Sequence, residues 1–262
     1  MKAREIVELI KANVGNPWRE GFRDTFKVGN PDVEVKGVAT TVMSTFAQIK
    51  RAHAAGMNMI VSHEPTFWSD NDSTKDIGAD PVFLAKQKFC LDNDMVVWRF
   101  HDNWHARNKP DMEAYATALQ LGLASANPAE YTNQSQIFTI PETTLGELAA
   151  RVKKLLSVKA LRVAGDPTMK VRRVICGVGS GTPALSPDAD VAIGGEGIET
   201  DGGFDSTEYA RDAAALGRSK GFIILGHAVS EEPGMDSCAI WLRTFLKDTP
   251  VKFVPAGEPF WS

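Results

Sequence analysis

Three short segments of the sequence place histidine and carboxylate side chains directly after an aliphatic run. These segments read IVSHEP, RFHDNWH and ILGHAVSE, and together they contain four of the five histidines of the chain. Imidazole combined with carboxylate suits zinc, iron, manganese or nickel as a bound ion. The side chains predicted as metal ligands are His63, Glu64, His101, His105, His227 and Glu231.

Each segment follows a stretch that is typical of a short buried strand: MNMIVS, MVVWRF and FIILG. Open α/β sheets bind ligands at the carboxyl ends of their strands, so side chains at these ends are expected to share one pocket. Six candidates exceed the needs of one tetrahedral ion. The sequence therefore predicts two divalent ions with open positions for water, as in two-metal hydrolytic sites, where the ions lie about 3.5–4 Å apart.

Each segment also has a simpler interpretation when it is taken alone. A histidine at a strand end is often only a hydrogen-bonded loop residue. His227 and Glu231 are four residues apart and could form a pair on a helix surface. HDNWH could be a polar turn above a packed Trp104. His53 lies inside a predicted helix and is assigned a structural role. The recurrence of the pattern after three strands favours the shared site.

Strand-like and helix-like segments alternate along the chain, which predicts an α/β fold with mixed or largely parallel sheets. The first fifteen residues predict an amphipathic helix. A polar, proline-containing stretch near 124–135 suggests a boundary between two α/β lobes, 1–130 and 131–262. The other main predictions are strands at 33–42 and in QIFTI, ALRVAG, VRRVICGV, DADVAIGG and VKFVPAG, and helices at 44–55 from Ser44, in PVFLAKQKFCLDND, DMEAYATALQLGL, TTLGELAARVKKLL and DSCAIWLRTFLKD, and at 205–218.

The composition is that of an ordinary globular protein, with 262 residues, 43% hydrophobic residues and a net charge of −4. No basic patch that would favour nucleic acid is expected. No apolar run approaches the roughly 20 residues of a membrane span, and the N-terminus lacks a signal-peptide pattern. The three cysteines are scattered, which argues against a disulfide framework or a thiolate zinc site and favours a cytoplasmic location.

Two further motifs add candidates to the site. GVGSG at 177–181 follows a predicted strand, and a tight turn is favoured over a phosphate-binding loop because no helix clearly opens after it. Glu196 lies in the glycine-rich, acidic stretch 194–203 and is a candidate base or a residue supporting a ligand. Phe67, Trp68 and Trp104 are expected to pack, with the alternative that they wall a cavity for a planar substrate.

At these motifs the chain resembles the NIF-three-like dinuclear metal-binding proteins, also known as GTP cyclohydrolase I type 2 homologues. The resemblance runs over nearly the whole chain and is sharpest in IVSHEP, RFHDNWH, VRRVICGVGSG and ILGHAVSE. The family pattern has Ser-His-His-Pro at the first of these segments and His-Thr-Asn-Leu-Asp at the second. At the last it has Gly-His followed by Glu four residues later. This chain has Glu64 in place of the second histidine and His105 in place of the aspartate.

The resemblance implies two α/β lobes with the metals in the cleft between them, and a ring-shaped homohexamer. It makes His63, His227 and Glu231 the firmest ligands, with Glu231 a candidate bridge between the ions. His101 is implied as a ligand or proton carrier. In the predicted mechanism His101 or Glu196 assists proton transfer. The predicted function is hydrolysis of a nucleotide, phosphoester or cyclic amide-like bond with two divalent ions, zinc favoured and iron or manganese as alternatives. A non-catalytic metal-binding or regulatory scaffold is the alternative function.

Overall fold

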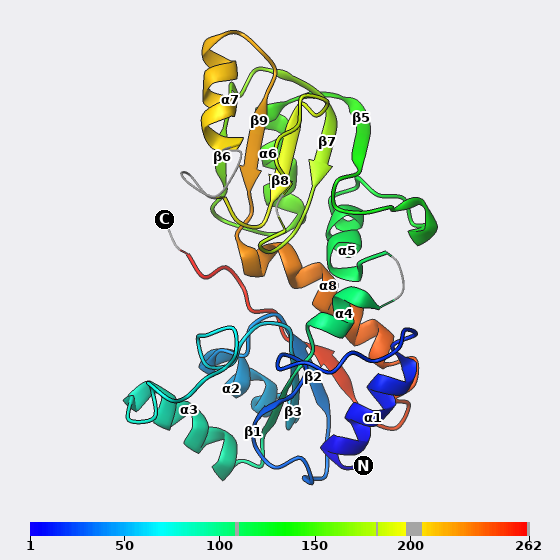
Figure 1. The fold of residues 1–262 in the computed structure, drawn as a ribbon, viewed down its shortest axis with the longest axis vertical. Coiled ribbons are helices and arrows are strands. Elements are labelled where there is room, and N and C mark those ends of the chain that lie inside the picture. Colours follow the sequence, from blue (N-terminus) through cyan, green and yellow to red (C-terminus); the bar gives the residue numbers. More distant parts are fainter. Residues whose placement is uncertain (108–109, 182, 198–205, 261–262) are drawn as a thin grey trace. The chain divides into compact units, whose positions relative to one another are not determined.

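The computed structural model describes residues 1–107, 110–181, 183–197 and 206–260 (Figure 1). The chain forms two compact units, which are described separately. The first comprises Met1–Asp111 and Met235–Ala256, and the second comprises Met112–Gly234 and Gly257–Ser262. The α/β prediction is confirmed, since each unit contains a five-stranded mixed sheet with helices. The predicted lobe boundary at 130 lies inside the second unit, because the helix that follows Asp111 packs into the core of that unit.

The sheet of the first unit has the order β1-β4-β3-β2-β10. Its strands are β1 (Phe26–Val28), β2 (Val38–Thr41), β3 (Met59–Ser62), β4 (Val96–Arg99) and β10 (Val251–Phe253). Strands β10, β2, β3 and β4 run parallel, and β1 is antiparallel at the edge. Ser62 pairs with Arg99, so β3 and β4 end level with each other. The residues that follow these two strands therefore leave the sheet side by side.

Four helices belong wholly to the first unit: α1 (Ala3–Asn13), α2 (Phe46–Ala54), α3 (Pro81–Asp92) and α4 (Asp102–Ala106). The side chain of Asp80 accepts the N–H groups of Val82 and Phe83 and caps α3, as Asp does at helix starts. Helix α2 begins later than predicted, since the hydroxyl of Ser44 contacts that of Thr66 at 3.0 Å instead of capping the helix.

The sheet of the second unit has the order β5-β7-β8-β9-β6. Its strands are β5 (Ile137–Thr144), β6 (Arg162–Ala164), β7 (Lys170–Cys176), β8 (Val191–Gly194) and β9 (Gly221–Ile224). Strands β7, β8 and β9 are parallel, with β5 and β6 antiparallel at the edges. The helices are α5 (Met112–Gln120), α6 (Leu145–Leu155) and α7 (Ser206–Ala215), with a short 3₁₀ turn, η1 (Pro128–Glu130). The predicted capping box of α6 is confirmed, with Thr144 and Glu147 exchanging hydrogen bonds.

Helix α8 (His227–Leu242) begins nine residues before the predicted start at Asp236. Pro233 and Gly234, residue types that usually interrupt helices, lie inside this helix ahead of the predicted start. Gly234 has a packing reason: an added Cβ would overlap the carboxylate of Glu113 on α5. Because α8 starts directly after Gly226, His227 and Glu231 lie in its first turns.

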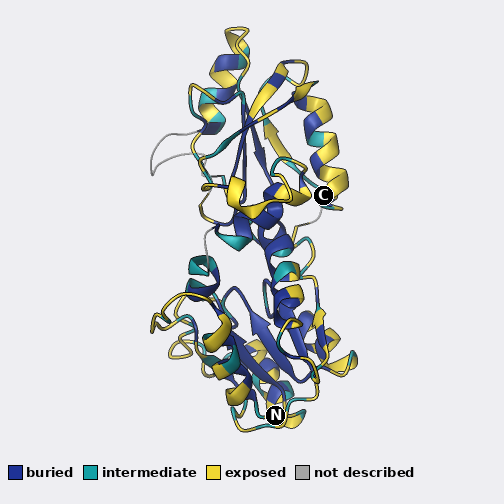
Figure 2. Cartoon of the chain, turned by 90° about the vertical axis from the view of Figure 1, so that its right-hand side faces the viewer, coloured by how far each residue is buried: buried dark blue, intermediate teal, exposed yellow. Residues whose placement is uncertain are grey.

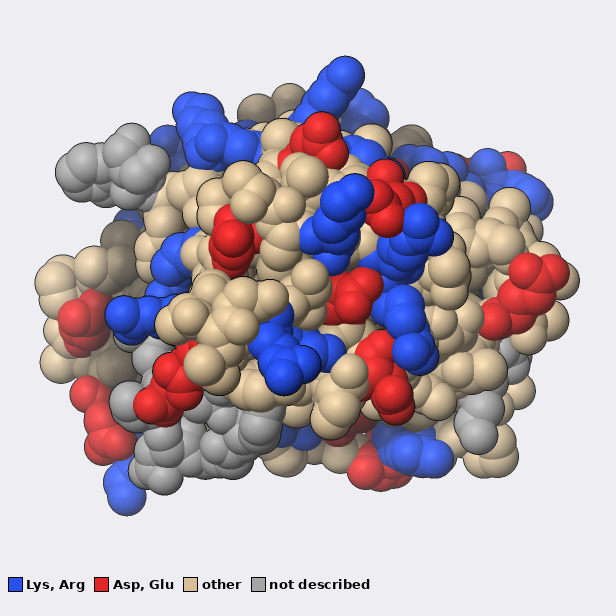
Figure 3. Space-filling view, turned by 90° about the horizontal axis from the view of Figure 1, so that it is seen from above, with Lys and Arg blue, Asp and Glu red and all other residues tan. Residues whose placement is uncertain are grey.

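Every residue is buried in five strands, which are dark blue in Figure 2: β2, β3, β4, β8 and β9. Cys90, Cys176 and Cys238 are all buried. On the face shown in Figure 3, lysines and arginines are interspersed with aspartates and glutamates. Among the described residues, no helix has the length and apolar character needed to cross a membrane.

A buried lysine of the first unit gives a prediction about stability and pH. The Lys86 side chain is buried on α3, where its ammonium donates to the carbonyl oxygen of Thr66 and lies 5.4 Å from the centroid of the Phe67 ring. Burial lowers the pKa of Lys86 to about 8. A lysine with a native pKa below its unfolded value binds fewer protons when folded, so the free energy of unfolding rises between about pH 8 and pH 10.5.

We expect this contribution to add about 2 kcal/mol to the free energy of unfolding between about pH 7.5 and pH 9.5. Urea unfolding of the wild type and of Lys86→Met at both pH values measures it. Burial also raises the pKa of the Cys90 thiol to about 11, which lowers the free energy of unfolding as the pH rises. Both proteins contain Cys90, so the difference between them reports on Lys86. An equal pH dependence of the two proteins would contradict this account.

Candidate metal centre

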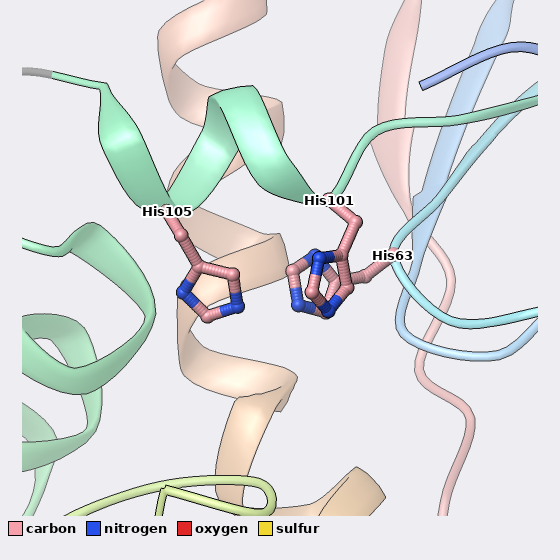
Figure 4. Close-up of side chains that lie close together, drawn as sticks. All are labelled: His63, His101 and His105. Carbon is pink, nitrogen blue, oxygen red and sulfur yellow. The ribbon is translucent and has the colours of Figure 1, made fainter. Parts of the chain in front are cut away.

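Three histidines of the first unit lie together at the carboxyl end of its sheet (Figure 4). His63 follows β3, His101 follows β4, and His105 lies one turn later on α4. The ring centroid of His63 is 4.5 Å from that of His101 and 4.9 Å from that of His105, and the last two are also 4.9 Å apart. One nitrogen from each ring lies within 4.8 Å of the others, so the three can serve as ligands of one metal ion.

Each of these rings is held at its Nδ1 atom by an oxygen acceptor. The partner of His63 is the carbonyl oxygen of Phe100, at 3.1 Å. His101 contacts the Asp102 carboxylate at 2.8 Å, and His105 contacts the Asp111 carboxylate at 3.0 Å. A carbonyl or carboxylate oxygen can only accept, so Nδ1 carries the proton and Nε2 carries the lone pair that a metal needs. Metal-binding histidines typically have such a supporting acceptor.

Burial keeps His63 neutral. Its side chain is fully buried, and this loss of hydration lowers the pKa of His63 well below its usual value, with the neighbouring His105 and His101 adding to the effect. A neutral imidazole is the form that binds metal. His63 therefore presents its lone pair at neutral pH without competition from a proton.

Glu64 lies between a histidine and a buried arginine. Its Oε1 atom is 3.5 Å from Nε2 of His101, and its Oε2 atom is 3.3 Å from Nη2 of Arg99. The fully buried Arg99 also donates from Nε to the carbonyl oxygen of His63 at 2.9 Å. Arg99 thus fixes the main chain of one candidate ligand and the carboxylate of the next, and it offsets the charge of Glu64.

Asp24 holds the start of α4, the single turn that carries His105. Its carboxylate accepts the backbone N–H groups of His101, Asp102 and Asn103 at 2.5, 3.1 and 2.8 Å, and the side-chain amide of Asn103 at 2.5 Å. A helix of five residues cannot be stable without such contacts. Sequence reasoning missed both α4 and Asp24, because the capping carboxylate comes from 77 residues earlier in the chain.

The second unit brings His227, Glu231 and Glu196 together. Nδ1 of His227 is 2.5 Å from Oε1 of Glu196, and its Nε2 is 3.2 Å from Oε2 of Glu231. His227 and Glu231 are one turn apart on α8, whereas Glu196 follows β8. Glu196 thus occupies the position of a carboxylate that orients a ligating imidazole.

The glycine-rich turn after β7 lies against this group. Gly179 has a φ of +54°, and an added Cβ would overlap Oε1 of Glu231 and come within 3.0 Å of Nε2 of His227. Its N–H donates to the Ser230 hydroxyl at 2.9 Å, and its carbonyl accepts the N–H of Glu196 at 3.0 Å. The prediction of a tight turn is confirmed. Its role here is to let backbone approach the two side chains closely.

Each unit therefore gathers its own share of the predicted residues. The first unit holds His63, Glu64, His101 and His105, and the second holds His227, Glu231 and Glu196. That all of them serve one pocket stays a prediction. His53 lies elsewhere on α2, with its ring 5.6 Å from that of Phe89. Phe67 and Trp104 are buried packing residues, while Trp68 is exposed.

Comparison with known proteins places this fold and these residues in a family. The chain belongs to the Duf34/NIF3 (NGG1p interacting factor 3) family, whose sequence model matches residues 1–257. It is similar to a protein of Clostridium perfringens called GTP cyclohydrolase 1 type 2 homolog, with 22% identity over 98% of this chain and 97% of that protein. The family predicted from the motifs is confirmed.

Two solved structures share the fold. The hypothetical protein SA1388 of Staphylococcus aureus matches with a TM-score of 0.71 and 18% identity, covering 100% of this chain and 99% of the other. A Bacillus cereus protein related to NIF3 matches with a TM-score of 0.70 and 17% identity, covering 100% and 98%. At such identities the likeness concerns the fold alone.

The cap of α4 can be tested by removing its carboxylate. We expect Asp24→Ala to lower the free energy of unfolding by about 1–2 kcal/mol, since three backbone donors lose their acceptor. Because α4 carries His105, the same change should weaken Co²⁺ binding by about 10–100-fold. Urea unfolding and Co²⁺ titration by absorption measure the two effects.

The matched control is Asp80→Ala, which removes the carboxylate cap of α3. It should have a similar cost in stability, with Co²⁺ affinity unchanged. Equal Co²⁺ affinities of the two variants would show that the cap of α4 does not position the histidines.

Proposed function

We propose that the protein is a divalent-metal-dependent hydrolase that binds two ions and acts on a nucleotide, a phosphoester or a cyclic amide-like bond. The observation that carries the proposal is the histidine cluster, in which three imidazoles gather with each Nδ1 held by an oxygen acceptor. Three histidine ligands on one ion are typical of catalytic rather than structural metal sites.

The donor set fits a divalent transition ion. Imidazole and carboxylate suit zinc, which we favour, and also iron or manganese. Cys90 and Cys176 lie in the hydrophobic cores. The proposed ligands are His63, Glu64, His101 and His105 in the first unit and His227 and Glu231 in the second. When bound, such ions polarise a substrate oxygen and activate water.

The surrounding side chains would hold and move protons. Asp102 fixes the His101 ring through Nδ1, and Glu64 lies beside its Nε2, so we assign His101 to proton transfer as well as to metal binding. Glu196 is partly exposed and contacts His227. It can exchange protons with solvent, and we assign it as the second proton carrier. By resemblance we also propose a cytoplasmic homohexamer.

A second candidate function is a non-catalytic metal-binding or regulatory scaffold. The contact between Glu64 and Arg99 favours it, because a carboxylate that already has a buried cationic partner is a weaker metal ligand. A site with one weakened donor could retain metal without supporting turnover.

Both candidate functions require bound metal, so the metal content of the protein tests them together. We expect reconstituted wild-type protein to bind two transition-metal ions per chain, and His63→Ala to lose at least one of them, because the variant removes a fully buried ligand. Elemental analysis after gel filtration measures this. His53→Ala is the control, since its ring packs on Phe89 away from the cluster. Substoichiometric metal in the wild type, even after reconstitution, would overturn the proposal.

Turnover separates the hydrolase from the scaffold. A panel of GTP, cyclic dinucleotides, phosphodiesters and small cyclic amides should contain a substrate whose hydrolysis is lost in both His63→Ala and Glu231→Ala. Hydrolysis of that substrate should persist in two control variants, His53→Ala and Glu232→Gln. The second control changes the carboxylate next to Glu231. Hydrolysis that survives both ligand variants would exclude the proposed site, and a fully metallated protein inactive on the whole panel would favour the scaffold.

A further inference from the structure

The first unit contains a cavity of about 490 Å³ beside the histidine cluster. Small-molecule sites typically have volumes of about 300–1,000 Å³, so the cavity is large enough for a small ligand. The residues that line it are Arg19, Glu20, Asp102, His105 and Ala106. Because His105 is one of the candidate metal ligands, a molecule in this cavity would lie directly beside the candidate metal centre.

The chain segment that forms one wall of the cavity is anchored to α4. The side-chain amide of Asn16 donates to the carbonyl oxygen of Ala106. The buried Asn103 bonds both main-chain groups of Arg19: its Oδ1 accepts the N–H at 2.9 Å, and its Nδ2 donates to the carbonyl oxygen at 2.9 Å. Arg19 lies outside any regular element, yet its backbone has a fixed place relative to the helix that carries His105.

Two charged side chains of the cavity wall have no partner of their own. In the part of the chain that the structure describes, neither the guanidinium of Arg19 nor the carboxylate of Glu20 makes a hydrogen bond or an ion pair. Asp102 differs from them, since its carboxylate contacts Nδ1 of His101 at 2.8 Å and Nη1 of Arg23 at 3.3 Å. The wall therefore offers a ligand one cation and one anion, on adjacent residues that do not pair with each other.

These two charges select a class of ligand. A guanidinium matches a carboxylate with two parallel hydrogen bonds, and a carboxylate accepts hydrogen bonds from an ammonium group. The two side chains do not contact each other, so the groups they bind must also be apart. The ends of a dipeptide are separated by one residue more than those of an amino acid, about 3.3–3.6 Å. A polyanion would be repelled by Glu20 and Asp102.

We propose that this cavity binds a short zwitterionic peptide, with its carboxylate at Arg19 and its ammonium group at Glu20. Binding through these two side chains requires neither metal nor turnover, so it is independent of the hydrolase function. If both hold, the peptide bond would be the amide bond that lies beside the candidate metal centre.

Dipeptide binding to the full-length protein tests the proposal. The protein is first freed of metal with EDTA and gel filtration, because peptides chelate transition ions. Alanyl-alanine, its N-acetyl derivative and its C-terminal amide are then titrated by saturation-transfer NMR. We expect the zwitterion to bind at least fivefold more tightly than either capped form. Arg19→Gln should remove the preference over the amide, and Glu20→Gln the preference over the N-acetyl form.

The matched control is Arg151→Gln, which removes an exposed arginine on α6 of the second unit, outside the cavity. It should leave all three affinities unchanged. Both cavity variants should fold, since Arg19 and Glu20 are exposed and Asn103 holds only the backbone of Arg19. No measurable binding of alanyl-alanine, equal binding of the three peptides, or affinities that neither cavity variant changes would overturn the proposal, whatever the metal content or turnover of the protein.

Discussion

The histidine cluster depends on the parallel pairing of β3 with β4. The register that sets Ser62 opposite Arg99 makes both strands end at the same level. Phe100 then offers its carbonyl oxygen to Nδ1 of His63, and His101 follows at once. A one-residue shift in the register would point every side chain of a strand to the opposite face and separate the two rings. The cluster is thus a consequence of main-chain hydrogen bonding in a buried sheet.

Buried ion pairs hold the side chains that the sheet positions. Arg99 projects from β4 with its guanidinium fully buried, where Glu64 and Asp70 both lie within 3.3 Å of it. A buried charge is tolerated only when it is paired and hydrogen-bonded, so removing one partner is costly. At the start of α4, the Asp24 carboxylate accepts the backbone N–H groups that have no acceptor within the helix. The candidate ligands therefore lie on a frame of paired charges and hydrogen bonds, which is what a metal site needs for a fixed geometry.

The sequence predicted the parts of this arrangement that depend on local pattern. Short aliphatic runs predicted β3, β4 and β9, and the residues directly after β3 and β4 predicted the histidine cluster of the first unit. The sequence did not predict α4, Asp24 or Arg99, because their roles come from contacts between distant segments and leave no local periodicity. The early start of α8 was missed for a related reason. Gly234 interrupts the helix pattern, but it is explained by the closeness of Glu113, which only the folded chain reveals.

The two departures from the family pattern each have a partner of compensating charge in the first unit. Glu64, where the pattern has histidine, adds a negative charge, and the guanidinium of Arg99 lies 3.3 Å from it. His105, where the pattern has aspartate, removes a negative charge. The Asp111 carboxylate lies 3.0 Å behind that imidazole and makes it a better donor. In this chain, each of the two candidate ligands that depart from the pattern therefore has a charged side chain beside it, Arg99 for Glu64 and Asp111 for His105.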